Sequence, residues 1–152
     1  MSDSAHDGMP EMPPEFCVSG LFCLALAVYF EARGEQIPDG QLAVAHTVMN
    51  RVESDQFPNT ICEVVKQGKY RGTLPLRNQC AFSFWCDGKP EHIRNQGAWA
   101  QAWGISALVM LGLSDDPTDG STHYHASYVS PGWADRDQFI TEIGNHLFYR
   151  LQ

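Results

Sequence analysis

The sequence predicts a mainly α, α+β domain with a small β element, and three observations support this class. The chain has 152 residues, of which 43% are hydrophobic, and this length suits one domain with its own core. Apolar residues recur with helical spacing over most of the chain, whereas short β-like pieces occur only after residue 122. We therefore expect a single domain over residues 17–152, preceded by an acidic, disordered lead-in over residues 1–16 that contains three prolines.

The first predicted helix is an apolar run over residues 18–30, which only Ser19 and Gly20 interrupt. A second helix follows the turn at residues 38–40. It extends over about residues 40–52, where apolar residues recur at three- and four-residue spacing. These two segments supply most of the expected core.

A third, short helix is expected after Thr60, whose side chain can cap it, and it should end near residue 65. The chain then predicts a loop over residues 67–72 and irregular structure over residues 73–90. A fourth, amphipathic helix over residues 98–113 should end at a glycine before a polar stretch.

The last part of the chain predicts β-like pieces around residues 123–125, 139–140 and 143–149. The acidic stretch at residues 115–120 superficially resembles a calcium loop. Pro117 occupies a ligand position there and the distal glutamate is absent, so we interpret this stretch as a turn.

Composition argues against two classes of partner. Eighteen acidic and ten basic residues give a net charge of -8, which disfavours binding to nucleic acid because phosphate recognition needs clustered Lys and Arg. The first apolar run has about 14 residues, fewer than the about 20 that span a bilayer, so we expect no membrane insertion. No basic segment precedes this run, so we expect no secretory signal and synthesis in the cytoplasm.

The five cysteines leave two interpretations open. None is in a CxxC pair, which argues against a structural zinc site. They form one or two disulfides if the protein works in an oxidising compartment, or they are five small buried residues in a reducing one. The odd number leaves at least one thiol unpaired in a monomer. The five are Cys17, Cys23, Cys62, Cys80 and Cys86.

Two carboxylates follow the first apolar helix, and this location predicts a buried acid. Glu31 closes the helix, and Glu35 comes directly after Gly34. Burial disfavours the charged form of a carboxyl group and raises its pKa. A carboxylic acid that stays protonated near neutral pH can donate its proton to a leaving oxygen, as cleavage of a glycosidic bond requires.

A series of collinear blocks extends over residues 20–150. The blocks are Glu31-Ala32-Arg33-Gly34-Glu35, Gly40-Gln41-Leu42-Ala43-Val44-Ala45, Asn50-Arg51-Val52, Phe57-Pro58-Asn59-Thr60, Phe82-Ser83-Phe84-Trp85-Cys86-Asp87-Gly88, Asp116-Pro117-Thr118-Asp119-Gly120, His123-Tyr124-His125 and Ile143-Gly144-Asn145-His146-Leu147-Phe148-Tyr149. In this order they resemble the SleB-type cell wall hydrolases, the family of the spore-cortex lytic enzymes. The resemblance implies a small lysozyme-like catalytic domain whose partner is the glycan strand of peptidoglycan.

The resemblance also implies a reaction. The family is described as lytic transglycosylase: it cleaves between N-acetylmuramic acid and N-acetylglucosamine and leaves a 1,6-anhydro-muramyl end. Spore-cortex members usually carry a separate peptidoglycan-binding domain, and from the length of 152 residues we expect none here. A stand-alone hydrolase without an export signal resembles a phage endolysin released through holin lesions, or a bacterial enzyme whose export sequence is not in this chain. We expect it to act on the cell wall as a monomer.

Glu31 is the predicted catalytic residue, with Glu35 as the alternative, because lysozyme-like enzymes place their acid at the end of a core helix. Protonated Glu31 would donate to the glycosidic oxygen, and its carboxylate would then deprotonate the muramyl C6 hydroxyl. Gly34 indicates a helix break, so Glu35 would instead contact backbone or substrate, or pair with an arginine. A hydrolytic muramidase of the same fold stays open, because entry of water beside Glu31 decides the product.

Aromatic and amide side chains are predicted to line the substrate groove, because sugars present apolar faces edged with hydroxyl and N-acetyl groups. The candidates are Gln41, Gln79, Phe82, Ser83, Trp85, Tyr124, His125 and Trp133. Tyr124 should face Glu31, where its hydroxyl would orient the acid or the N-acetyl carbonyl of the substrate. For Phe82, plain core packing is the favoured interpretation.

Two functions of other classes are also considered. His123 and His125 should share one face of a strand, and with His46 or His146 and Asp119 they would form the zinc site of an amidase. No HExxH or other dense ligand motif occurs, so we expect no metal and no cofactor. An inactive wall-docking module is the other alternative. A carboxyl group stranded beside an apolar helix costs stability unless it is used, which argues against that module.

Overall fold

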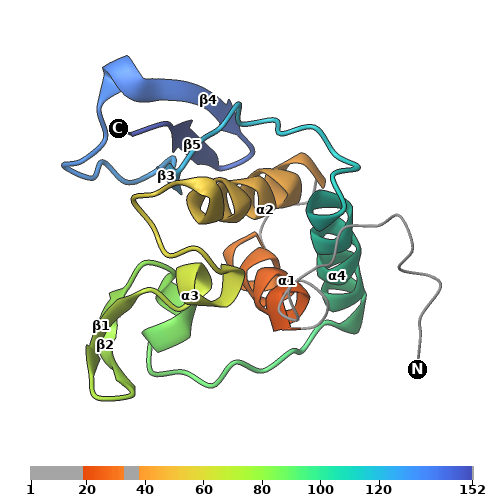
Figure 1. Ribbon diagram of the computed structural model, residues 1–152, viewed down its shortest axis with the longest axis vertical. Coiled ribbons are helices and arrows are strands. Elements are labelled where there is room, and N and C mark those ends of the chain that lie inside the picture. The colour runs from red at the N-terminus through yellow and green to blue at the C-terminus, as the bar shows by residue number, and fades with distance from the viewer. Residues whose placement is uncertain (1–18, 33–37, 152) are drawn as a thin grey trace.

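The structure is a computed structural model that describes residues 19–32 and 38–151, and its architecture is mixed α+β (Figure 1). The helices of the described residues are α1 (Gly20–Glu31), α2 (Pro38–Glu53), α3 (Ile61–Val65), η3 (Ser83–Cys86), α4 (Gln96–Met110) and η4 (Arg136–Gln138). The strands are β1 (Gly68–Arg71), β2 (Leu74–Cys80), β3 (His123–Ala126), β4 (Phe139–Ile143) and β5 (His146–Tyr149). The predicted fold class is confirmed, while the expected lead-in over residues 1–16 lies outside the described residues.

Helix α1 is the centre of the core. Its side chains are apolar on nearly all sides, so it must be covered all round, and it packs against α2, α3 and α4. Figure 1 shows α1 between α3 and α4, with α2 crossing beside it. Leu24, Ala25 and Ala27 are fully buried. The last residue of this buried helix is Glu31, which therefore lies at the edge of the core.

The hairpin of β1 and β2 was missed by the sequence analysis. The expected loop at residues 67–72 and the irregular structure expected after residue 73 are wrong there, because both strands pair antiparallel. Every residue of β1 is exposed, so the alternation that marks a half-buried strand is absent. Gly68 lies so close to the opposite strand that an added Cβ would be 2.8 Å from Cys80 Cα.

The other three strands form an antiparallel sheet in the order β3-β5-β4, and these strands confirm the predicted β-like pieces. In the register, Tyr124 pairs with Phe148. Their rings contact each other on the sheet face toward the helices, with centroids 5.5 Å apart. His123 and His125 lie on the opposite face, where both contact Trp133. This pattern directs Tyr124 toward the core and the two histidines away from it.

Two disulfides resolve the open interpretation of the cysteines. Cys23–Cys62 joins α1 to α3, and Cys80–Cys86 connects the end of β2 to the end of η3. The fifth cysteine, Cys17, lies outside the described residues. No helix in the described part of the chain has the length and apolar character that crossing a bilayer requires.

The two disulfides should differ in their effect on stability because they close loops of different length. The sequence separations are 39 and 6 residues. The double change Cys23→Ala with Cys62→Ala should lower the free energy of unfolding by about 4 kcal/mol, and Cys80→Ala with Cys86→Ala by about 2 kcal/mol. Urea denaturation of the two double variants and the wild type measures both losses. Equal losses would contradict the loop-length explanation.

Candidate active site

Glu31 and Tyr124 form the central contact of the site. The Tyr124 hydroxyl donates a hydrogen bond of 2.6 Å to Glu31 Oε1, which joins the end of α1 to the middle of β3. These residues are 93 positions apart in the sequence, and the expectation that Tyr124 faces Glu31 agrees with this geometry. Glu35, the alternative acid, lies outside the described residues.

The surroundings of Glu31 favour its protonated form. Burial raises the pKa of its carboxyl group above the usual value of 4.5. The hydrogen bond from Tyr124 and the charges of His146 and Arg51 act in the opposite direction, but burial outweighs them. Burial likewise holds the pKa of the Tyr124 hydroxyl well above its usual value, so this group stays a hydrogen-bond donor. Glu31 therefore keeps its proton to a higher pH than an exposed glutamate.

Arg51 is a buried cation beside this pair, and sequence reasoning missed its role. It is 8% exposed, and its Nε donates a hydrogen bond of 2.7 Å to the Thr122 carbonyl. Its guanidinium lies 5.0 Å from the ring centre of Phe57 and 5.3 Å from that of Phe82. Burial lowers the pKa of Arg51, while Tyr124 and Glu31 raise it. The sequence feature that could have indicated this role is the position of Arg51, which continues the apolar stripe of α2.

Two clefts meet at Glu31. The 87–94 cleft has a volume of about 500 Å³ and is lined by Phe30, Glu31, Ser83, Phe84, Asp87, Lys89, Pro90, His92 and Arg94. The 124–129 cleft has a volume of about 400 Å³ and is lined by Phe30, Glu31, Arg51, Ala81, Phe82, Ser83, Tyr124, His125, Ala126, Tyr128, Val129 and His146. Glu31 lines both clefts, so a chain-like ligand that occupies them passes the acid.

Four of the predicted groove residues line these clefts. Ser83 lines both of them, while Phe82, Tyr124 and His125 line the 124–129 cleft. Phe82 is only 1% exposed and belongs to the core, as the favoured interpretation held. His125 is fixed by a hydrogen bond of 2.8 Å between its Nε2 and the Tyr149 hydroxyl.

The other four predicted groove residues are not among the residues that line these two clefts, and their role in substrate binding stays a prediction. Gln41 accepts a hydrogen bond from Gln101, which ties α2 to α4. Gln79 is exposed on β2. Trp85 donates to the Tyr70 hydroxyl and packs under Lys66. Trp133 is 41% exposed and packs on the outer face of the three-stranded sheet.

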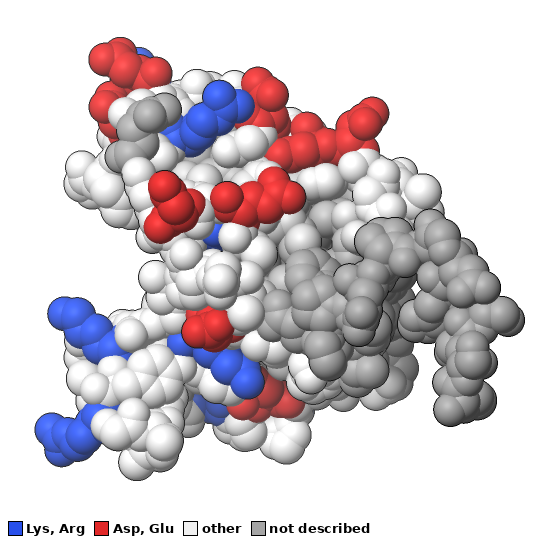
Figure 2. All heavy atoms as spheres, viewed as in Figure 1, with Lys and Arg blue, Asp and Glu red and all other residues white. Residues whose placement is uncertain are grey.

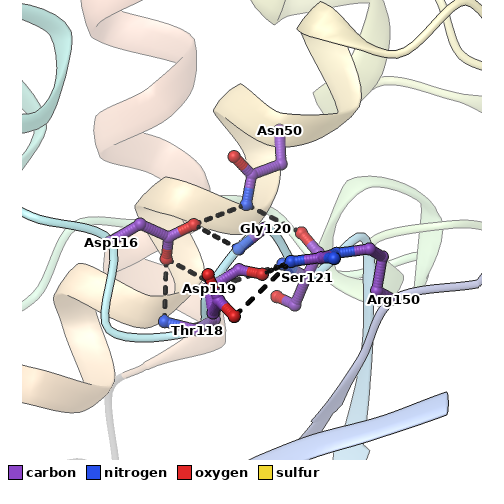
Figure 3. Close-up of polar contacts among 7 residues, drawn as sticks. All are labelled: Asn50, Asp116, Thr118, Asp119, Gly120, Ser121 and Arg150. Atoms are coloured by element: carbon purple, nitrogen blue, oxygen red, sulfur yellow. Dashed lines mark hydrogen bonds and ion pairs between the residues drawn. The ribbon is translucent and has the colours of Figure 1, made fainter.

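The turn before β3 is closed by one carboxylate (Figure 3). Asp116 accepts hydrogen bonds from the Thr118 backbone N–H at 2.8 Å, the Thr118 hydroxyl at 2.6 Å, the Gly120 backbone N–H at 2.8 Å and the Asn50 side chain at 2.9 Å. Burial raises the pKa of Asp116, but these hydrogen bonds together lower it by more. The net pKa is therefore below its usual value. The predicted turn is confirmed, and its acid acts as an internal acceptor.

Helix α2 holds the segment that leads into β3. Thr47 Oγ1 lies 2.8 Å from Ser121 Oγ, Asn50 donates to the Ser121 carbonyl at 2.9 Å, and Arg51 donates to the next carbonyl. Arg150 also contacts Asp119 of the same turn (Figure 3). These bonds fix the backbone only a few residues before Tyr124, so they position the hydroxyl that contacts Glu31.

The histidines do not gather into a metal site within the described residues, where no group of three His, Cys, Asp or Glu side chains can hold a metal ion. His123 and His125 share a face as expected, but His146 lies against Tyr124 on the other face. His46 forms a hydrogen bond with Ser114 instead. Burial and the charge of Arg51 lower the pKa of His123 to about 4.

Comparison with known proteins now identifies the family. Residues 35–149 match the family model described as Cell Wall Hydrolase. The chain belongs to the cell wall hydrolase family. The match begins at Glu35, so Glu31 lies just before the part of this cell wall hydrolase domain that the family model covers.

Curated relatives and solved structures agree with this family and with its SleB type. The chain is 44% identical to a spore cortex-lytic enzyme of Bacillus subtilis over 139 residues, which covers 90% of this chain and 39% of that protein. It is 30% identical to a spore cortex-lytic enzyme of Halalkalibacterium halodurans over 138 residues, which covers 90% of this chain and 36% of that protein. The chain thus spans less than half the length of these curated relatives.

Two solved structures resemble the fold of this cell wall hydrolase. The catalytic domain of the Bacillus cereus SleB protein superposes with a TM-score of 0.68 at 28% identity and covers 94% of this chain and 100% of that chain. The catalytic domain of the germination-specific lytic transglycosylase SleB from Bacillus anthracis gives a TM-score of 0.65 at 29% identity, with 91% and 100% covered. Both comparisons support the α+β class.

Substitution of Asn50 should test how α2 supports the site. Asn50→Ala removes the donor to both Asp116 and the Ser121 carbonyl, so we expect a loss of about 1–3 kcal/mol in the free energy of unfolding. Wall-degrading activity should fall as well, because the segment before Tyr124 is less fixed. Asn59→Ala, at an exposed asparagine, is the matched control. Unchanged stability and activity in Asn50→Ala would contradict the supporting role.

The raised pKa of Glu31 also predicts a dependence of stability on pH. The folded state holds this proton more tightly than the unfolded chain does, so Glu31 contributes stability below the usual pKa of 4.5 that is lost as pH rises through the folded pKa. Glu31→Gln cannot ionise. At pH 7 its melting temperature should exceed that of the wild type by about 2–4 °C, the shift that about 1 kcal/mol produces in a domain of this size.

The difference in melting temperature should shrink as the pH is lowered toward about 4, where wild-type Glu31 is mostly protonated in both the folded and the unfolded state. Thermal unfolding followed by circular dichroism at pH 4 and pH 7 measures it. The control is Glu142→Gln, at an exposed position on β4, for which we expect no such gain at pH 7. A Glu31→Gln protein less stable than the wild type at pH 7 would contradict the effect of burial.

Proposed function

We propose that this domain is a lytic transglycosylase that cuts the glycan strand of peptidoglycan between N-acetylmuramic acid and N-acetylglucosamine. The observation that carries the proposal is the position of Glu31, a carboxyl group with a raised pKa where two clefts meet. A glycan strand that occupies both clefts presents one glycosidic bond to the acid. The name of the Bacillus anthracis neighbour, a lytic transglycosylase, supports the same reaction.

In the first step Glu31 is the general acid. Its proton passes to the glycosidic oxygen while the bond between that oxygen and C1 of the muramyl sugar breaks, and positive charge develops at C1. The departing sugar leaves with a free hydroxyl group. Tyr124 is a positioning residue in this step, because its hydrogen bond fixes the carboxyl group in one orientation.

In the second step the same residue is the general base. The Glu31 carboxylate takes the proton of the muramyl C6 hydroxyl as the C6 oxygen bonds to C1, which forms the 1,6-anhydro ring and restores the acid. The buried Arg51 cation stabilises the carboxylate between the two steps, since its charge lowers the pKa of Glu31. No water molecule is consumed.

A single carboxyl group is enough for this route, and the described residues that line the two clefts fit that requirement. Among the described residues that line the two clefts, Asp87 is the one carboxylate besides Glu31. Its Oδ1 accepts the backbone N–H of Lys89 at 2.8 Å, so it shapes its own loop. A hydrolytic muramidase would need a second group that activates water or attacks the sugar. The one-carboxylate mechanism is therefore favoured.

The products of digestion test this proposal. Purified peptidoglycan, with spore cortex material first because the relatives are named for it, is digested with the wild type, Glu31→Gln and the control Glu142→Gln. Mass spectrometry of the released fragments should show anhydro-muramyl ends for the wild type and the control. Glu31→Gln should reduce the rate at least about 1000-fold while wall binding persists, because the acid and the base are both removed.

Each other outcome identifies a different function. Reducing ends that depend on Glu31 would indicate a hydrolytic muramidase. Free peptides beside an intact glycan strand would indicate an amidase, and sensitivity to chelators would then support a zinc enzyme. Binding without any cleavage would indicate a wall-docking module. All three contradict the proposed transglycosylase.

A further inference from the structure

The charge of this chain is unevenly distributed. The whole chain has a net charge of -8, yet residues 66–94 contain six Lys and Arg side chains and only two acidic ones. The six are Lys66, Lys69, Arg71, Arg77, Lys89 and Arg94. In Figure 2 most of the visible acidic side chains lie over the lobe of the three-stranded sheet, and most of the visible basic side chains lie on the lobe of the β1–β2 hairpin.

The basic segment contributes one wall of the 87–94 cleft. Lys89, His92 and Arg94 all line it, and the Arg77 guanidinium packs against the backbone at Gly88 in the same loop. In the part of the chain that the structure describes, neither Lys89 nor Arg94 forms an ion pair with a carboxylate. Asp87 is the acid that shares this wall, and it is engaged with its own loop. The cleft thus offers cationic groups to a ligand.

The backbone of this wall is anchored to the core. The Tyr29 hydroxyl accepts hydrogen bonds from the N–H groups of Arg94 and Asn95, at 3.2 and 3.1 Å. Tyr29 belongs to the buried helix α1 and lies two residues before its last residue, Glu31. The 124–129 cleft differs, because its lining includes a single Lys or Arg, the buried Arg51, which is bonded to the Thr122 carbonyl. The two sides of Glu31 therefore present different charge to a substrate.

We propose that the 87–94 cleft binds the stem peptide of a muramyl sugar, with Lys89 and Arg94 contacting its carboxylates. The inference rests on the proposed function, since it assigns a substrate group to that groove. Where the lactyl group of a muramyl sugar is amide-linked to a stem peptide the sugars carry no charge, so the anionic groups near such a strand are the carboxylates of the peptides. A protein of net charge -8 repels them, and only local cations overcome this repulsion within the screening length of about 8–10 Å.

Binding of the stem peptide makes the site specific for strands whose muramyl sugars carry peptides. Charge-assisted hydrogen bonds from a lysine and an arginine to carboxylates are stronger than neutral ones, and the arginine can bind a carboxylate through two parallel bonds. Strands whose muramyl sugars carry peptides are consequently cut faster than bare strands. The preference weakens as salt concentration rises, because these cations lie at the rim of an open cleft.

The test compares two substrates and two double variants. One substrate is peptidoglycan freed of teichoic acids. The other is the bare strand that remains after an amidase has removed the stem peptides, with the lactyl carboxylates that this cleavage exposes converted to neutral amides by a carbodiimide and ammonia, so peptide carboxylates are the anions that distinguish the two substrates. Lys89→Gln with Arg94→Gln should lower kcat/KM on the peptide-bearing strand by about tenfold or more. On the bare strand its kcat/KM should stay within about twofold of the wild-type value. The control, Lys69→Gln with Arg71→Gln, makes the same charge change on β1 outside the cleft and should alter neither rate by more than about twofold.

The outcomes separate this inference from the proposed function. Equal rates of the wild type on both substrates, or an equal loss in both double variants, would overturn the peptide site while leaving the transglycosylase in place. If Lys89→Gln with Arg94→Gln lowers kcat/KM as much on the bare strand as on the peptide-bearing strand, the peptide site is also overturned. Absence of cleavage of either substrate by the wild type would instead overturn the proposed function. Restoring teichoic acid without peptides should not restore the preference, which excludes phosphate as the recognised anion.

Discussion

The set of hydrogen bonds from α2 to the turn before β3 is the constraint on which the site depends. A sheet at the surface of a helical core can shift relative to that core unless polar contacts fix it. Here Asn50 and Arg51 bond to successive carbonyls at residues 121 and 122, and Asp116 closes the turn by accepting from backbone and side chain. Because these partners are partly or wholly buried, loss of one leaves an unsatisfied polar group, which makes the alignment energetically costly to disturb.

The same alignment keeps a difficult pair of groups together. The carboxyl group of Glu31 and the guanidinium group of Arg51 are buried near one another, and burial disfavours the charged form of each. Two aromatic rings and a carbonyl surround the cation, and a phenol contacts the acid. The fold therefore keeps in place an acid whose burial opposes ionisation, which is typical of functional sites and lowers the stability of the folded protein at neutral pH.

The sequence predicted those parts of the molecule in which a single physical requirement dominates. The apolar run before Glu31 has to be a buried helix, and its end had to place a carboxyl group at the core boundary. The β1–β2 hairpin was not predictable in this way, because its strands are largely exposed and polar and their pairing depends on a close approach between Gly68 and Cys80. The contacts of Trp85 and Trp133 were not predictable for a related reason: an aromatic ring suits a sugar-binding groove and a surface packing contact equally well, so the sequence does not say which contacts the ring makes.

For the proposed transglycosylase, the meeting of two clefts at one acid has a consequence for where the glycan strand is cut. A pocket that stops at the acid accepts only the end of a chain, whereas space on both sides accommodates sugars before and after the bond that faces Glu31. Such an arrangement suits attack at interior bonds. An enzyme that acts in this endo fashion breaks a cross-linked mesh with few cuts, so the wall loses its mechanical strength well before much soluble material is released.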